Sequence, residues 1–182
     1  MKKTETKEAE QEPRATPGAG VTAASPMGGY SHPLYGLVQK QPFFKGLSSA
    51  QLLVLAESAV IMQYGTDEVI FAECDQANRF YLILEGRVSL EAEAADRRTL
   101  PIQTLGPGED LGWSWLFPPY LMHFAARALE PTRVILFYGT RLRQQCEEDH
   151  DFGYEIMKRV AAVMMHRLQA TRQQWLGKPL LG

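Results

Sequence analysis

The chain has 182 residues, of which 45% are hydrophobic, and a formal net charge of −2 at pH 7. This length suits one domain whose core is large enough to fold without disulfide staples. The slight acidity argues against the basic face that binding to a nucleic-acid backbone requires. The two cysteines, Cys74 and Cys146, have no Cys-x-x-Cys spacing, so we expect reduced thiols in preference to a disulfide.

No targeting or membrane segment is predicted. The N-terminus is charged and has no apolar stretch typical of a signal peptide. No run of about 18 apolar residues predicts a transmembrane helix. We therefore expect a cytoplasmic protein without a membrane partner.

Residues 1–30 are predicted to form a disordered tail. They alternate Lys and Glu, and then become rich in Pro, Gly, Ala and Thr. This composition leaves too little apolar surface to offset the entropy lost on ordering. The remaining residues, 31–182, are expected to form a single domain.

Helical patterns come first after the tail. The apolar spacing from Leu34 predicts a helix that ends at Pro42. Ser48 and Gln51 have the spacing of a capping box, so a second helix is predicted from there to about Ser58.

From Val60 onward the apolar pattern changes to a period of two, which predicts short strands. The predicted strands are 60–64, 69–71, 80–84, 88–92, 100–104, 124–129 and 132–137. Turn residues such as Glu85-Gly86 and Glu130-Pro131 separate them. Many short strands at regular spacing favour a barrel or jelly roll over a parallel sheet.

Helical periodicity returns after Phe137. A short helix is predicted over 140–148, and a long C-terminal helix over 151–177. Asp151 is the expected N-cap of the long helix, and Gly177 its end.

The long helix carries both apolar and basic residues. Its wide apolar stripe consists of Phe152, Ile156, Met157, Val160, Val163, Met164, Leu168 and Trp175. Part of this stripe is expected to pack on the barrel; the rest either joins the same core or pairs with a second copy in a homodimer. Its basic residues alternate with apolar ones and are interpreted as a solvated face; they are Lys158, Arg159, Arg167 and Arg172.

A glycine-rich segment interrupts the strands at residues 106–115. Its sequence, Gly-Pro-Gly-Glu-Asp-Leu-Gly-Trp-Ser-Trp, combines exposed backbone N–H groups with flat aromatic side chains. Small-ligand pockets use this combination. Glu109 and Asp110 precede Gly112 and are expected to cap or solvate the turn.

The order of these motifs resembles the cyclic nucleotide-binding domain family, and its Crp/Fnr-like branch in particular. Three segments carry the resemblance: Pro-Phe-Phe-Lys-Gly-Leu at 42–47, Phe-Tyr-Leu-Ile-Leu-Glu-Gly-Arg-Val at 80–88, and Gly-Pro-Gly-Glu-Asp-Leu-Gly at 106–112. The resemblance extends from about Pro42 to Leu176. It implies a mainly β fold: a cyclic nucleotide-binding-like β-roll (double-stranded β-helix or jelly roll) with flanking helices and a long C-terminal helix.

This sequence lacks two charged groups of the family's phosphate-binding cassette. In the family a Glu after the glycine binds the ribose 2′-hydroxyl, and an Arg pairs with the cyclic phosphate, whose buried charge needs such a partner. Here Trp113 stands at the Glu position. Counting back from Arg127 places Met122 at the Arg position, whereas counting forward from Gly112 places His123 there. These differences weaken the expectation of a cyclic nucleotide as cofactor, but leave it open.

Three interpretations of the insert follow from these departures. In the first, the pocket binds another small molecule or a partner protein, with His123 as a titratable donor and tryptophans as stacking surfaces. In the second, a cyclic nucleotide still binds through backbone N–H groups and His123, although one His lacks the bidentate fork of Arg. In the third, the tryptophans and Pro118-Pro119 fill the cavity. The candidate ligand-binding residues are Gly108, Leu111, Gly112, Trp113, Ser114, Trp115, Met122, His123 and Phe124.

Catalysis, metal binding and DNA binding are not predicted. The four histidines include no His-x-His pair, and no nucleophile elbow, P-loop or dinucleotide fingerprint occurs. The family's DNA-binding regulators continue after the long helix into a helix-turn-helix domain, whereas only residues 178–182 follow Gly177 here. We therefore expect a stand-alone domain that is not an enzyme, does not bind DNA and acts through a protein partner.

Three functions are consistent with this sequence. The first is a sensory or regulatory module that binds a small nucleotide-like ligand and reports it through the long helix to a dimer mate or partner. The alternative is a non-sensing accessory subunit of a larger cytosolic complex, since stand-alone domains of this kind resemble small subunits of oxidoreductases such as the soluble hydrogenases. A second alternative is a true cyclic AMP or cyclic GMP binder.

Overall fold

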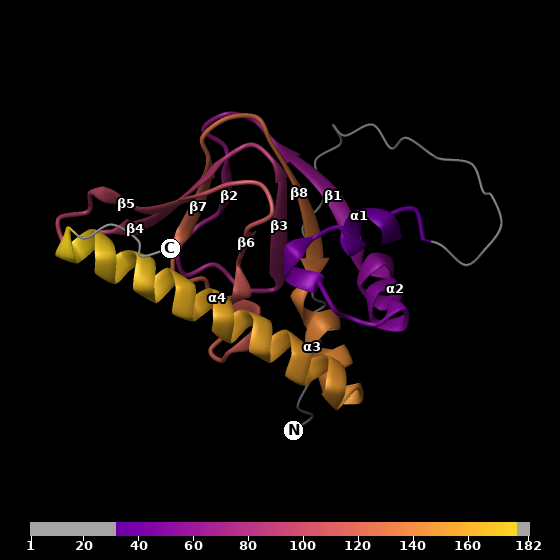
Figure 1. Cartoon of the computed structure of the whole chain (residues 1–182). Coiled ribbons are helices and arrows are strands. Elements are labelled where there is room, and N and C mark those ends of the chain that lie inside the picture. The colour runs from indigo at the N-terminus through magenta and orange to yellow at the C-terminus, as the bar shows by residue number, and fades with distance from the viewer. Residues whose placement is uncertain (1–31, 178–182) are drawn as a thin grey trace, which may run out of the picture.

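The computed structural model describes residues 32–177. The predicted disordered tail, 1–30, lies outside this range, as do residues 31 and 178–182 of the predicted domain. Figure 1 shows the arrangement of the described part: a β-roll, with α1 and α2 at one end and α4 running lengthwise below it.

Three helical segments precede the roll: α1 (Tyr35–Gln39), the 3-10 turn η1 (Pro42–Phe44) and α2 (Ser49–Glu57). The predicted capping box is confirmed. The backbone N–H of Gln51 donates to Ser48 Oγ at 3.2 Å, and the backbone N–H of Ser48 donates to Gln51 Oε1 at 3.0 Å. These reciprocal bonds satisfy N–H groups at the helix start and so define where α2 begins.

Eight strands of the described chain form two antiparallel sheets. The first has the order β1 (Ala59–Tyr64), β8 (Thr132–Tyr138), β3 (Arg79–Glu85) and β6 (Asp110–Leu111). The second has the order β2 (Val69–Phe71), β7 (Ala125–Ala128), β4 (Val88–Glu93) and β5 (Thr99–Leu105). All seven predicted strands are confirmed, with ends that differ by at most one residue. The structure adds β6, whose two residues are too few to show a period.

The core of the roll is aromatic. The rings of Phe44 and Phe137 meet edge to face with centroids 5.3 Å apart, and Phe80 packs against Trp115 at 6.3 Å. Residues 134–137 of β8 are all buried. Consecutive burial in place of alternation means that both faces of this strand are covered.

Two helices follow the roll: α3 (Gly139–Glu148) and α4 (His150–Leu176), which confirms the predicted pair. The predicted N-cap was wrong. The backbone N–H of Phe152 donates to Asp149 Oδ1 at 2.9 Å, and Asp151 lies within the first turn of α4. A Cβ added to Gly153 would lie 2.7 Å from the carbonyl oxygen of Cys146, so α3 and α4 are in close contact here.

The apolar stripe of α4 divides into two parts. Phe152, Ile156 and Val160 are buried against the roll, and Val163 is partly buried. The remaining members of the stripe are exposed; they are Met157, Met164, Leu168 and Trp175. The first half of α4 is therefore fixed by the core, and its second half presents apolar side chains to solvent.

Both cysteines are free thiols, as predicted. Burial, together with the nearby carboxylates of Asp149 and Glu147, raises the pKa of the Cys146 thiol to about 11. No helix within residues 32–177 is long and apolar enough to cross a lipid bilayer.

Candidate functional site

The insert between β6 and β7 forms the candidate site. It begins at Gly112, whose φ is +81°, and an added Cβ there would lie 2.9 Å from the carbonyl oxygen of Arg79. Only glycine allows the chain to turn this close to β3. The 3-10 turn η2 (Trp113–Leu116) follows, and its geometry points Trp113 and Trp115 in different directions.

Trp115 attaches the insert to α3. Its side chain is 1% exposed and packs on Phe80. A Cβ added to Gly139 would lie 2.7 Å from Trp115 Cβ, which shows how closely the two segments approach. Arg143 of α3 donates to the Trp115 carbonyl oxygen at 2.5 Å, and its guanidinium lies 4.4 Å from the centre of the Tyr120 ring. Trp115 is thus a packing residue in this structure.

A small cavity of about 20 Å³ lies beside the insert. Six of the nine candidate residues line it, together with three side chains from elsewhere: Gly112, Trp113, Ser114, Met122, His123 and Phe124, with Phe71, Leu90 and Arg167. A small-molecule pocket measures about 300–1,000 Å³, and a water needs roughly 10–15 Å³ by this kind of measure. In the described state the cavity therefore has room for about one water molecule.

Gly108 and Leu111 lie outside the cavity lining and support the insert. The backbone N–H of Gly108 donates to the Ile83 carbonyl oxygen at 2.8 Å, and Leu111 is buried in β6 opposite Tyr81. Glu109 caps this turn, as predicted, because its Oε2 accepts from the backbone N–H of Gly106 at 2.7 Å.

One polar pair at the cavity comes from the insert itself. Ser114 Oγ and His123 Nδ1 lie 3.0 Å apart, and the tautomer of the histidine decides which atom donates. Ser114 is buried, whereas His123 is exposed. The pair therefore places a titratable ring at the boundary between the cavity and solvent.

A second polar pair joins β6, the strand directly before the insert, to α4. Arg167 Nη2 donates to the backbone carbonyl oxygen of Asp110 and lies 3.7 Å from Asp110 Oδ2. The two side chains are only 15% and 7% exposed. The expectation that Asp110 caps or solvates the turn was wrong, as was the expectation that Arg167 lies on a solvated helix face. Burial raises the pKa of the Asp110 carboxyl, and the charge of Arg167 opposes this rise.

Two features of the sequence could have indicated that each of these side chains is buried, although not that they contact one another. Asp110 directly precedes Leu111 and the turn at Gly112, and an aspartate in such an apolar segment needs a partner, because aspartates are almost never fully buried alone. An arginine among apolar residues can bury its aliphatic part. Arg159 behaves in the same way: its side chain is 13% exposed and donates to the Lys45 carbonyl oxygen at 2.7 Å.

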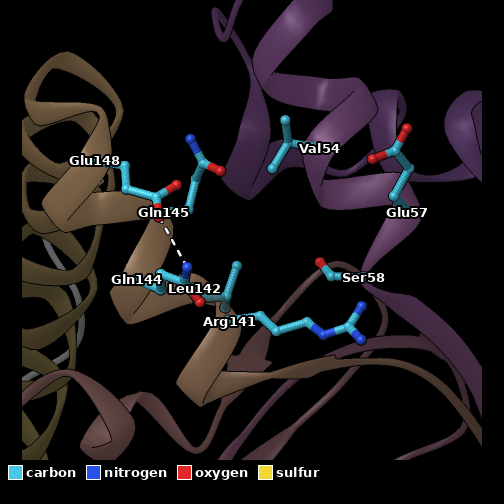
Figure 2. A pocket seen from close by; sticks show the side chains of 8 residues that line it. All are labelled: Val54, Glu57, Ser58, Arg141, Leu142, Gln144, Gln145 and Glu148. Carbon is cyan, nitrogen blue, oxygen red and sulfur yellow. Dashed lines mark hydrogen bonds between the residues drawn. The ribbon is translucent and has the colours of Figure 1, made fainter.

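A larger hollow of about 240 Å³ lies between α2 and α3 (Figure 2). Its charged side chains, those of Glu57, Arg141 and Glu148, belong to exposed residues. Gln144 Nε2 donates to Glu148 Oε1 at 2.8 Å, as the dashed line in Figure 2 shows. These polar groups face water, so nothing in this hollow requires a ligand. No group of three potential metal ligands occurs within residues 32–177.

Comparison with known proteins gives a consistent result. The family model of the cyclic nucleotide-binding domain matches residues 61–149. A crystal structure of a protein from Geobacter metallireducens GS-15, provisionally named a cyclic nucleotide-binding protein, is 33% identical to this chain. That alignment covers 73% of this chain and 96% of the Geobacter chain, with a TM-score of 0.67.

More distant relatives share the fold. A cyclic nucleotide-binding domain from Methylobacillus flagellatus KT is 19% identical, over 82% of this chain and 84% of that one, with a TM-score of 0.67. The CRP-like cAMP-activated global transcriptional regulator of Mycobacterium tuberculosis is 22% identical over 135 residues. The match covers 74% of this chain but only 58% of that regulator.

Proposed function

Because this chain belongs to the cyclic nucleotide-binding domain family, we propose that it is a regulatory module that senses a small nucleotide-like ligand beside the insert. Its long helix α4 transmits occupancy to a protein partner. The observation that carries this proposal is the Asp110–Arg167 pair, which connects β6, directly before the insert, to α4, and whose Arg167 lines the cavity. A ligand larger than water must displace side chains between the insert and α4, so ligand binding shifts the population of α4 positions.

The ligand is proposed to bind without the two charged contacts of the family cassette. Met122 is 3% exposed and offers a thioether, which cannot pair with a phosphate. His123 is already bonded to Ser114. The cations that line the cavity are therefore limited to Arg167 and, when protonated, His123. The missing contacts argue against cyclic AMP bound as in the family. They favour a different nucleotide-like ligand.

A thermal-shift screen of the full chain tests the sensory function. The ligands are cyclic AMP, cyclic GMP, cyclic di-nucleotides and nicotinamide nucleotides. A ligand at about 100 times its dissociation constant stabilises the folded state by about 2.7 kcal/mol, which raises the Tm of a domain this size by roughly 5–10 °C. His123→Ala should remove a shift caused by an anionic ligand, whereas His166→Ala, on the exposed side of α4, should leave it unchanged.

Silence across the whole panel at millimolar concentration would favour the second candidate, a non-sensing accessory subunit of a larger complex. Two observations support that candidate. The cavity is too small for a nucleotide in the described state. The second half of α4 exposes large apolar side chains, with Leu168 69% and Trp175 89% exposed, and such surfaces typically mark a protein contact.

The exposed side chains of α4 recur at heptad spacing, and we propose that this seam pairs two copies of the chain. The positions seven residues apart are Tyr154, Ala161, Leu168 and Trp175; those between them are Met157, Met164 and Thr171. All seven are exposed. Apolar a and d positions at this spacing are the pattern of a two-stranded coiled coil. A homodimer would therefore bury the part of the stripe that the roll leaves uncovered.

Leu168→Glu is expected to weaken self-association by about 100-fold or more, because each copy loses a buried leucine and gains a charge at the seam. Sedimentation equilibrium over a range of concentrations measures this directly. Gln169→Glu adds the same charge one position away from the seam and should leave the dimer intact. A wild-type chain that sediments as a monomer, or equal masses for both variants, would contradict the seam.

A further inference from the structure

We propose that Arg167 is the cationic group of an anion subsite between the insert and α4, and that the Asp110 carboxylate is an internal anion which a ligand's phosphate displaces. The inference rests on the proposed function, because it names the ligand chemistry and the α4 residue that detects it. The subsite consists of Arg167 with Ser114 and His123, which line the same cavity.

The position of Arg167 is the first support. Its guanidinium has five N–H donors, and its contacts among the described residues are both with Asp110. Only one of these two contacts is a hydrogen bond, and its acceptor is the backbone carbonyl oxygen of Asp110. Other N–H groups of the Arg167 guanidinium are therefore available for a second acceptor. The side chain is only 15% exposed, so such an acceptor would be largely shielded from solvent.

The unsatisfied state of Asp110 is the second support. The residue is 5% exposed, and its Oδ2 accepts no hydrogen bond from any residue in the 32–177 range. At 3.7 Å from Arg167 Nη2, this oxygen lies beyond hydrogen-bond distance. A buried carboxylate oxygen without a hydrogen-bond partner destabilises the folded state, so a donor that reaches Oδ2 or a group that replaces it is favoured. The carboxylate of Asp110 therefore pairs with Arg167 without a direct hydrogen bond, and a phosphate that makes such bonds can compete with it.

The chemistry of the subsite selects the class of ligand. A phosphate group has several oxygens that can accept two parallel N–H bonds from one guanidinium, and such bidentate pairs are roughly twice as strong as neutral hydrogen bonds. Ser114 and His123 lie 3.0 Å apart and can donate to a further oxygen. The half-buried ring of Trp113 on the same cavity offers a stacking surface. These features together suit a phosphate attached to a flat ring, as in a nucleotide.

The size of the cavity explains how binding is reported. About 20 Å³ does not hold a phosphate group, so the ligand enters only when the Arg167 side chain leaves Asp110 and the cavity widens. Because Arg167 belongs to α4, this exchange breaks the contact between α4 and β6 and so allows that helix to move. The subsite and the reporting element therefore share one residue.

Isothermal titration calorimetry on the full chain tests the subsite with two probes, inorganic phosphate and adenosine 5′-monophosphate. Arg167→Gln should weaken binding of both probes at least about tenfold, because a charge-assisted hydrogen bond is lost. Asp110→Asn should strengthen binding about tenfold, because it removes the competing anion while preserving the side-chain shape. Arg172→Gln, an exposed position on the same helix, is the matched control and should bind like wild type.

Equal binding by wild type, Arg167→Gln and Asp110→Asn would overturn the subsite. If Asp110→Asn fails to fold by circular dichroism, Arg167→Lys decides instead: it keeps the charge but loses the fork, and should bind phosphate more weakly than wild type and more tightly than Arg167→Gln. Tighter binding of adenosine monophosphate than of phosphate identifies a nucleotide site, and equal affinity identifies a site for the free anion.

The failure of the subsite and the failure of the sensory function give different results. A nucleotide that raises Tm equally in wild type and Arg167→Gln retains the sensory function and rejects the subsite. Phosphate binding that depends on Arg167, without any change in the fluorescence of Trp175 on α4 or in the association state, retains the subsite and rejects transmission through α4.

Discussion

Replacing Trp115 with alanine is expected to lower the free energy of unfolding by about 3–5 kcal/mol, the cost of removing a large aromatic side chain from a packed core. Trp115 is 1% exposed, and it lies between Phe80 of the roll and Gly139 of α3. The cavity left by the indole cannot close, because both neighbours belong to regular elements. Urea unfolding followed by circular dichroism gives the loss, and a thermal scan should show a Tm lower by roughly 10 °C.

Trp175→Ala is the matched control for this substitution. The same side chain is removed, but Trp175 is 89% exposed, so the expected change is within about 0.5 kcal/mol at a concentration where the chain is monomeric. Trp115→Phe should cost less than Trp115→Ala, because it retains a ring and removes an indole N–H that has no hydrogen-bond partner within the described chain. Similar losses for Trp115→Ala and Trp175→Ala would contradict the role of burial.

The second large effect is expected at Gly86, in the turn between β3 and β4. Its φ is +89°, and an added Cβ would lie 2.5 Å from Thr132 Oγ1 and 2.7 Å from the Pro131 carbonyl oxygen. The left-handed conformation costs a residue with a Cβ about 1–2 kcal/mol, and the clash with β8 adds about 1–3 kcal/mol. Gly86→Ala should therefore lower the free energy of unfolding by about 3 kcal/mol, measured by urea unfolding.

Two other glycines separate the contributions to this loss. Gly177 has φ +59° with no atom within 4 Å of an added Cβ, so Gly177→Ala reports conformational strain alone, about 1 kcal/mol. Gly36, within α1, has open space and no positive φ, and Gly36→Ala should stabilise by about 0.5–1 kcal/mol. The steric explanation fails if Gly86→Ala costs no more than Gly177→Ala.

Much of the roll could be predicted from the sequence because its strands alternate and its turns use distinct residues. Gly86 illustrates this: the Glu-Gly pair that indicated a turn is also the place where β8 leaves no room for a Cβ. β6 could not be predicted, since two residues show no period. The N-cap of α4 was displaced from Asp151 to Asp149 because both positions carry the same capping side chain, and only the backbone decides between them.

The position of the candidate insert could be predicted, whereas ligand binding by its residues stays a prediction. The sequence indicated the insert, and the structure places six of the proposed residues around one cavity. It could not indicate that Trp113 lines this cavity while Trp115 enters the core, since the two residues belong to the same short turn. Nor could it pair Asp110 with Arg167, which are 57 positions apart. Such contacts depend on where α4 crosses the roll, and no local pattern encodes this.

The close contact of α3 and α4 at Gly153 restricts how α4 can move. A methyl group does not fit between this residue and the Cys146 carbonyl oxygen, so the two helices cannot slide past one another at their crossing. Arg143 of α3 also donates a hydrogen bond to the insert. A rotation of α3 and α4 together about their contact would therefore move the insert as well. If α4 moves when Arg167 separates from Asp110, we expect the movement in the part of the helix after Val160, its last fully buried apolar residue. We therefore expect ligand-dependent changes in the second half of α4, with the contact between α3 and α4 at Gly153 unchanged.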